Sequence, residues 1–279
     1  MIKHIHIITS TNQELSCGYV ISQMAEYWQS EGVIVTTGPS LSTDADIGIL
    51  HVDSTLVAEK YLSENLSACP ILNSKLLDIS KRRISKRLLD ENSAYSGPVI
   101  IKTDANCFGK REFKQLSKWS FKRLRQKLTK KIPWQIMREL PWNNYPILKS
   151  KADVPDWVWK RKDLVVEQFL PEIENGEYVL RVWLFLGDMD YVLKMVSSEP
   201  VVKAGNIIRR EVLQTVPEAL RAIRAEMEID FGKFDYVEVD GEVILLDVNK
   251  TPTTSSRGAP SENLIRVARG IMHYGEQKL

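Results

Sequence analysis

The first part of the chain, residues 1–74, alternates short apolar runs with one longer segment of helical periodicity. Ile5–Thr9 predicts a strand, and Gln13–Gln29 predicts a helix because apolar side chains recur there every three to four residues. Further strands are predicted at Ile34–Thr37, Ile47–Val52 and Pro70–Asn73. Strands that alternate with helices favour a parallel sheet, so we expect a Rossmann-like α/β domain over residues 1–74.

The last third of the chain shows a different pattern. Two amphipathic helices are predicted, at Pro217–Met227 and Glu262–His273. Between them lie two runs rich in β-branched and aliphatic residues, Tyr236–Val239 and Val243–Val248, separated by Asp240-Gly241. Such runs around an Asp-Gly pair predict a β-hairpin.

Three polar residues lie together at one end of this hairpin: Asp235, Asp247 and Asn249. Unpaired charge at the end of a buried strand costs several kcal/mol, so its presence needs a reason. Carboxylate and carboxamide oxygens are the ligands that a hard divalent cation such as Mg²⁺ takes, above all when phosphates also hold it. The alternative is an ordinary hairpin with acidic residues at its solvent end.

The hairpin loop decides whether the three ligands share a face of the sheet. The two ligands on the second strand are two residues apart and therefore share a face. A two-residue loop at Asp240-Gly241 would place Asp235 opposite Leu246, which is the wrong face. We therefore expect a three-residue loop that begins at Val239, with Gly241 left-handed and a glycine bulge.

The spacing of this polar trio, aspartate, aspartate twelve residues on, asparagine two further on and then Pro252, resembles the terminal metal motif of the ATP-grasp superfamily. Further segments match the family in the same order. They are Asp78–Leu88 (DISKRRISKRL, the helix with a phosphate lysine), Pro98–Lys102 (PVIIK, a strand ending in a second lysine), Val165–Leu170 (VVEQFL, the linker between lobes) and Tyr178–Asp188 (YVLRVWLFLGD, an arginine-bearing strand). The resemblance implies an α/β ATP-grasp fold with α+β lobes at 75–165 and 166–279.

The same resemblance implies a cleft that binds ATP with Mg²⁺, or with Mn²⁺ in its place. Lys81 and Lys102 would face the phosphates, with Lys194 as a further candidate, while Lys86 competes with Lys81. The linker backbone would meet the adenine, and an acidic side chain would take the ribose. The residues implied are Glu167, Gln168, Phe169 and Leu170 for adenine and Glu172 or Glu174 for ribose.

Arginines would complete the chemistry that the family resemblance implies. Members activate a carboxylate as an acyl phosphate, which an amine or similar nucleophile then attacks. Arg181 and one of Arg209 and Arg210 would steady the transferring phosphoryl group, although Glu177 offers Arg181 a structural ion pair instead. The carboxylate would belong to a small molecule or a peptide.

The sequence departs from the family in two places. The loop after the phosphate lysine, Thr103–Glu112, has Gly109 as its only glycine, which puts loop closure and full turnover in question. The segment 111–131 then holds nine Lys or Arg against one Glu, a local charge of +8 in a chain of net charge +2. A solvated surface helix is the plain interpretation. A site for anionic lipid, nucleic acid, an acidic partner or an acidic substrate is the alternative.

Composition agrees with this interpretation without selecting it. The chain has 279 residues, 43% hydrophobic and 27% charged, typical of a globular enzyme. No apolar run approaches a membrane span, the N-terminus does not resemble a signal peptide, and three separated cysteines suggest no disulfide framework, so we expect a cytoplasmic protein. An ATP-dependent ligase is the primary hypothesis. A phosphotransferase or degenerate nucleotide-binding protein and a nucleic-acid or membrane-associated binding module are the alternatives.

Overall fold

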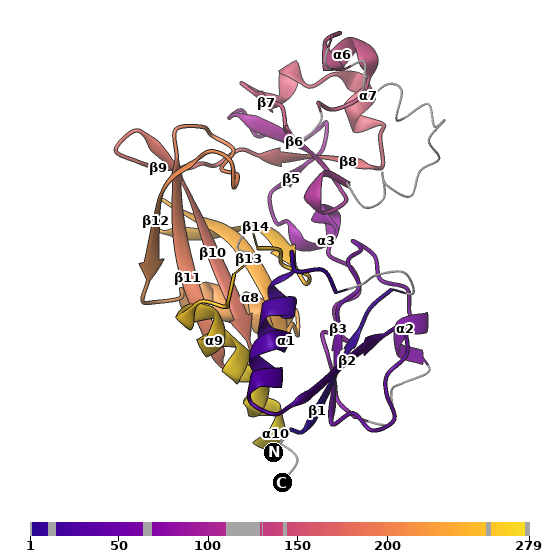
Figure 1. The fold of residues 1–279 in the computed structure, drawn as a ribbon. Helices are drawn as coiled ribbons and strands as arrows, with labels where there is room; N and C mark the ends of the chain where they lie inside the picture. Colours follow the sequence, from indigo (N-terminus) through magenta and orange to yellow (C-terminus); the bar gives the residue numbers. More distant parts are fainter. Residues whose placement is uncertain are drawn as a thin grey trace.

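The computed structural model describes residues 2–10, 15–63, 69–109, 129, 131–141, 144–254 and 258–276. These residues form three sheets: one from the N-terminal residues, a small one from the middle of the chain and a large one after it. In Figure 1 the small sheet lies above the other two. The basic segment 111–131 lies almost entirely outside the described residues, so its helix stays a prediction.

The N-terminal sheet is parallel, as the alternation of strands and helix predicted. Its strand order is β2-β1-β3-β4, with bounds β1 His4–Ile8, β2 Ile34–Gly38, β3 Ile47–Leu50 and β4 Ile71–Leu72. Helix α1 (Val20–Ser30) buries Ile21, Met24 and Trp28 against one face, and a short α2 (Lys60–Ser63) follows β3.

The helix predicted from Gln13 begins only at Val20. Its first residue and Gly18 bond to a distant segment: Val20 N donates to Pro252 O (2.9 Å), and Thr254 N donates to Gly18 O (2.9 Å). The N-terminal sheet is thereby joined to the chain that follows the polar hairpin.

The second sheet is small and antiparallel, with order β5-β8-β6-β7. Its strands are β5 Leu88–Leu89, β6 Val99–Thr103, β7 Ile147–Leu148 and β8 Leu164–Gln168. Short helical turns surround it: α3 Lys81–Ile84, η1 Cys107–Gly109, α6 Trp134–Met137, η2 Lys151–Asp153 and α7 Asp156–Trp159. The helix expected over Asp78–Leu88 is therefore only the four residues of α3, since the chain turns at Ser85 into β5.

The third sheet is the largest, with order β12-β11-β10-β13-β14 and β9 beside β10. Its strands are β9 Glu172–Glu174, β10 Glu177–Leu186, β11 Met189–Ser197, β12 Ile207–Leu213, β13 Phe231–Val239 and β14 Glu242–Asn249. Helix α8 (Glu218–Glu226) covers one face over Trp183, Phe185 and Phe234. Helix α9 (Glu262–Arg269) covers the other and lies against α1, where Trp28 Nε1 donates to Ala268 O (2.8 Å; Figure 1). The chain continues through η3 (Gly270–Met272) into α10 (His273–Glu276).

The hairpin loop differs from the prediction. Val239 pairs with Glu242, so the loop is the two-residue turn Asp240-Gly241, with φ of 51° and 80° at its central residues. Such a pair of left-handed residues matches the twist of the flanking strands. The three-residue loop was wrong, but the register shifts further along the hairpin, beside Asp235, and corrects the parity.

Candidate active site

The polar end of the hairpin is assembled by a bulge in β14. Tyr236 pairs with Leu245, and Asp235 pairs with Asp247, which leaves Leu246 as the extra residue. A bulge of this kind re-aims the side chains beyond it. Asp235 and Asp247 are therefore cross-strand partners on one face, and Asn249, two residues on, shares that face.

Each carboxylate at this end has a lysine partner. Lys81 Nζ from α3 donates to Asp247 Oδ1 (2.6 Å), and Lys233 Nζ lies 2.9 Å from Asp235 Oδ1. Burial alone would lower the pKa of both lysines. The charge of Asp247 overcomes this for Lys81, and that of Asp235 does so for Lys233, so both lysine pKa values are raised and both side chains stay charged.

These residues fit a divalent cation. Asp235 Oδ1 is buried and accepts no aligned hydrogen bond from the described residues. Burial raises the pKa of Asp235 in spite of Lys233, so the carboxylate lies in a place that favours added positive charge. The described residues contain no group of three or more His, Cys, Asp or Glu suited to a metal, so a third protein ligand would have to be of another type. The candidate is the amide oxygen of Asn249, which accepts from Thr251 N (2.9 Å).

A second buried pair lies on the small sheet. Lys102, near the end of β6, donates to Glu167 Oε2 on β8 (2.6 Å), and both side chains are at least nine-tenths buried. Glu167 Oε1 has no hydrogen-bond partner among the described residues. An unmatched buried acceptor is costly, so this oxygen is suited to receive a donor from a ligand.

The linker from Gln168 to Leu170 runs from the small sheet to the large sheet. Gln168 N donates to Arg87 O (3.0 Å) and Phe169 N donates to Pro98 O (2.9 Å). These bonds fix the linker against the first lobe. Strand β8 ends at Gln168, where the linker starts, and β9 begins after the linker.

Arg181 belongs to a network of acidic side chains rather than to the metal end. Its guanidinium donates to Glu172 through Nε (3.0 Å) and Nη2 (2.7 Å), and lies 3.6 Å from Glu174 and 3.5 Å from Glu238. Lys194 bonds to Glu174 in the same network. Glu172 also accepts a hydrogen bond from the backbone N of Glu238 (2.7 Å). Of the two acids, Glu174 has the more exposed side chain.

The arginines predicted to be catalytic are not brought to the polar hairpin. Arg181 pairs with Tyr236, the neighbour of Asp235, and neighbours along a strand point to opposite faces. Arg209 and Arg210 lie on the edge strand β12, exposed, and Arg209 bonds to Glu177 (3.1 Å). The sequence could not show that Arg209 and Arg210 lie far from the polar hairpin, because that depends on the strand order, in which β11 and β10 separate β12 from β13.

The glycine-poor loop after β6 is built around an aromatic contact. The ring of Phe108 stacks on that of Tyr145, with centroids 4.1 Å apart and an interplanar angle of 25°. The hydroxyl of Tyr145 lies 3.3 Å from Thr103 Oγ1, and burial raises the pKa of Tyr145 to about 12. Lys203, from the β11–β12 loop, places Nζ 5.7 Å from the Phe108 ring centroid.

The N-terminal sheet closes the metal end. Asp53, after β3, accepts from Tyr19 Oη (2.7 Å) and from Thr251 Oγ1 (3.3 Å). Thr55 Oγ1 accepts from the backbone of Asn106 in the glycine-poor loop (2.9 Å). Segments from all three sheets therefore converge on the polar hairpin.

Sequence reasoning missed several of these residues. Lys233 carried a usable signal, since it lies two residues before Asp235 and shares its face. Tyr145 and Lys203 carried none, because each reaches the cleft from a loop or short strand far away in the sequence. Lys86, the rival of Lys81, is 76% exposed and faces Glu226 at 3.8 Å.

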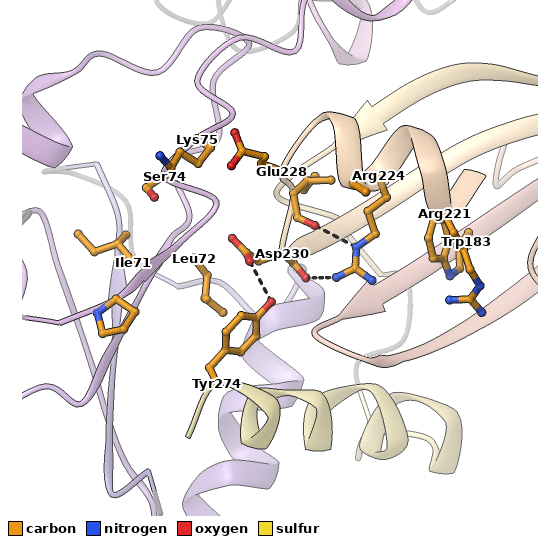
Figure 2. A pocket seen from close by; sticks show the side chains of 13 residues that line it. Ile71, Leu72, Ser74, Lys75, Trp183, Arg221, Arg224, Glu228, Asp230 and Tyr274 are labelled. Atoms are coloured by element: carbon orange, nitrogen blue, oxygen red, sulfur yellow. Dashed lines mark hydrogen bonds between the residues drawn. The ribbon is translucent and has the colours of Figure 1, made fainter. Parts of the chain in front are cut away.

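A hollow of about 540 Å³ lies away from the polar hairpin, between β4, α8 and the start of β13 (Figure 2). Its polar groups bond to one another: Asp230 accepts from Asn73 N (2.7 Å) and Tyr274 Oη (2.9 Å), and Arg224 donates to the carbonyls of Ile229 and Asp230. The hollow therefore lies where the N-terminal sheet meets the large sheet and its helix α8.

Solved structures share this fold. D-alanine–D-alanine ligase from Bacillus anthracis aligns over 100% of this chain and 98% of its own, with a TM-score of 0.52 and 12% identity. D-cycloserine synthetase DcsG aligns over 96% and 98% (TM-score 0.54, 8% identity), and the ATP-grasp ligase PsnB over 97% of each chain (TM-score 0.51, 12% identity). No family model and no curated protein matches the sequence.

The chain has the ATP-grasp fold, as its motifs predicted. Its mixed α/β architecture with several sheets agrees with the fold class that the resemblance implied. Among the described residues, none of the helices is both long and apolar enough to cross a membrane.

Proposed function

We propose that this protein is an ATP- and Mg²⁺-dependent ligase that activates a carboxylate as an acyl phosphate for attack by an amine. The observation that carries the proposal is the bulge in β14, which sets Asp235 opposite Asp247 beside Lys81 and Lys233. Two carboxylates and two lysines sum to no net charge, so a metal ion added here would act on the phosphates.

The polar hairpin supplies the metal ligands of the proposed site. Asp235, Asp247 and Asn249 would hold Mg²⁺, which neutralises charge on the β- and γ-phosphates when bound. Lys81 would bind the phosphates as a compact point charge, and Lys233 would add charge on the same face. The charge that the sequence assigned to Arg181, Arg209 and Arg210 would come from lysines instead.

The small sheet would hold the adenosine. Glu167 Oε1, buried and unmatched, would accept a hydrogen from the exocyclic amine of adenine, and the Gln168–Leu170 backbone would complete its edge. Lys102, bonded to Glu167, would lie between the base and the phosphates. Glu174 is the more exposed of the two ribose candidates and is our choice over Glu172.

The reaction follows from these contacts. An oxygen of the substrate carboxylate would attack the γ-phosphorus, break its bond to the β-phosphate oxygen and release ADP. The amine would then attack the acyl carbon, phosphate would leave, and the amine proton would pass to solvent. The chain's own work is to position the groups and to neutralise charge. PsnB is described in complex with a minimal precursor, Mg and ADP, and macrocyclase MdnC from Microcystis aeruginosa is described as bound with a precursor peptide, which supports a peptide carboxylate as one substrate class. ATP is held inside cells, so we propose a cytoplasmic protein.

Trapping the intermediate tests this proposal without knowledge of the amine. Hydroxylamine replaces the nucleophile and converts an acyl phosphate to a stable hydroxamate. We expect hydroxamate and ADP in equal amounts when a library of amino acids, dicarboxylic acids and Asp- or Glu-containing peptides is added with MgATP. Lys81→Met should abolish both products, whereas Lys86→Met on the exposed side should not. ADP released equally without any carboxylate would refute the ligase.

A nucleotide-binding protein without turnover is the second candidate. The stacked, glycine-poor loop favours it, because a loop fixed by Phe108 and Tyr145 opens less freely than a glycine-rich one. Calorimetric binding of MgATP, with no ADP from any member of the library, would support this candidate over the ligase.

A further inference from the structure

Phe108 holds an unusual position in the loop after β6. Its backbone is left-handed, with φ of 61°, and so is that of Cys107, with φ of 49°. Bulky residues avoid this region, and such conformations persist only where the surroundings impose them. A loop that only needed this shape would carry glycine, as Gly109 does at φ of 63°. The side chain of Phe108 is therefore retained for its contacts.

The loop is anchored at two points just before Phe108. Lys81 N donates to Asp104 O and Asn106 N donates to Thr55 Oγ1, each at 2.9 Å. These bonds join the loop to α3 and to the N-terminal sheet. The ring of Phe108 then completes the anchorage on the small sheet by stacking on Tyr145.

The ring also faces the opposite lobe. Lys203 Nζ lies 5.7 Å from its centroid, within the range of a cation–π contact. Lys203 sits on a turn fixed by Asn206, which donates to Val201 O (2.9 Å) and accepts from Lys203 N (2.7 Å). The two lobes thus meet through Tyr145, Phe108 and Lys203 in that order.

The neighbouring thiol shows what the loop covers. Partial burial raises the pKa of Cys107, the charges of Asp247 and Asp53 raise it further, and those of Lys233 and Lys81 oppose them. The thiol itself is exposed, and the charges that act on it are those of the metal end. The bond from Lys81 N to Asp104 O (2.9 Å) places the start of the same loop beside Lys81, which would bind the phosphates.

We propose that Phe108 is the nucleotide-retaining residue of this protein: its ring, between Tyr145 and Lys203, holds the loop over the phosphates and keeps the lobes together. The inference rests on the proposed nucleotide site and extends it. The contacts of the Phe108 ring would keep the nucleotide site covered, which a flexible glycine-rich loop would otherwise do. Bound MgADP leaves slowly while the contact is intact, and water is kept from the γ-phosphate.

The release rate of a fluorescent N-methylanthraniloyl-ADP with Mg²⁺, followed by stopped flow, tests the inference on the full chain. Phe108→Ala should raise the release rate about tenfold, since stacking and cation–π contacts each account for a few-fold in an equilibrium. Phe108→Tyr keeps the ring and should stay within twofold of the wild type. Lys203→Met should raise the rate about threefold, and Lys203→Arg should restore it.

Phe108→Gly separates the ring from the backbone shape. Glycine adopts the left-handed conformation freely, so the variant should unfold at a higher temperature than Phe108→Ala. It should nevertheless release the nucleotide as fast as Phe108→Ala and hydrolyse ATP without a carboxylate at an increased rate. Slow, wild-type release from the glycine variant would show that the ring is dispensable and would overturn the inference. A wild-type protein that binds no nucleotide would refute the proposed function itself, a distinct result.

Discussion

Two ends of the candidate cleft are rich in ion pairs, yet they are built differently. At the metal end, Lys81 and Lys233 each meet one carboxylate, and Asp235 keeps a buried oxygen without an aligned donor. At the linker end, Arg181 donates to both carboxylate oxygens of Glu172, and the backbone N of Glu238 also donates to Glu172. The metal end therefore keeps a carboxylate oxygen that a ligand could use, whereas the acceptors of Glu172 at the linker end are already occupied by protein donors.

The difference shows why charge alone does not identify a site. A closed network of buried charges maintains geometry, and removal of one member leaves the others uncompensated. An incomplete set with an unmatched oxygen is where a ligand gains most. Arg181 was assigned to catalysis from the pattern, whereas its bonds indicate that it orients β9 against β10.

The largest expected effect is a loss of folding stability when the ion-pair network at the linker end is broken. Arg181→Met leaves Glu172, 6% exposed, without its cation, and should lower the free energy of unfolding by about 3–5 kcal/mol. Urea unfolding followed by circular dichroism measures it. Arg209→Met breaks an exposed pair with Glu177 and should cost less than about 1 kcal/mol. Equal losses in the two variants would mean that the Arg181 network is not the closed structure described here.

Lys250, which has no carboxylate partner in hydrogen-bond range among the described residues, sharpens the comparison. Lys250, 2% exposed, donates to Leu76 O (2.8 Å), and burial lowers its pKa to about 8 despite the charge of Asp78. The unfolded chain then binds the proton more tightly, so stability rises as pH increases from about 8 to the ordinary lysine value. The rise should be roughly 3 kcal/mol, and Lys250→Met should remove it.

The measurement is the free energy of unfolding at several pH values from 7 to 11, as the difference between wild type and Lys250→Met. A difference that stays constant with pH would show that Lys250 keeps an ordinary pKa. Lys81 and Lys233, whose carboxylates raise their pKa, should contribute no such rise over this window.

A smaller effect tests the metal end by binding. Lys81→Met removes one charged donor to the phosphates and should weaken MgADP about 30-fold, or about 2 kcal/mol. Lys86→Met, whose side chain is 76% exposed, should change affinity by less than twofold. Isothermal titration calorimetry measures both. If the two variants lose affinity equally, Lys81 acts through the net charge of its segment.

The sequence predicted the fold through ordered motifs, and the structure confirms it. It also placed Asp235, Asp247 and Asn249 on one face, although for the wrong reason. Asp-Gly favours the two-residue turn that is present, and a bulge at Leu246 supplies the missing residue. Nothing in the apolar run VILLDV marks which leucine is extra, because both strands stay apolar on either side of the bulge.

Contacts between distant segments lie beyond the pattern. Alternation along β10 places Arg181 on a face, but only the cross-strand register with β13 shows that Asp235 lies on the other. Phe108 could not be selected from a loop of mixed polarity, since its partners Tyr145 and Lys203 come from two different lobes. Local periodicity carries no information about such pairs.

The central claim is that Asp235 and Asp247 form one metal site, and Mn²⁺ binding in the presence of ADP tests it most directly. Electron paramagnetic resonance counts free Mn²⁺ in wild type, Asp235→Asn, Asp247→Asn and Glu242→Gln, the last an exposed acid of the same hairpin. We predict that both aspartate variants, still folded, lose affinity about 100-fold or more, since ligand charge sets affinity for hard cations, while Glu242→Gln keeps it. Wild-type affinity within threefold in either aspartate variant would contradict it.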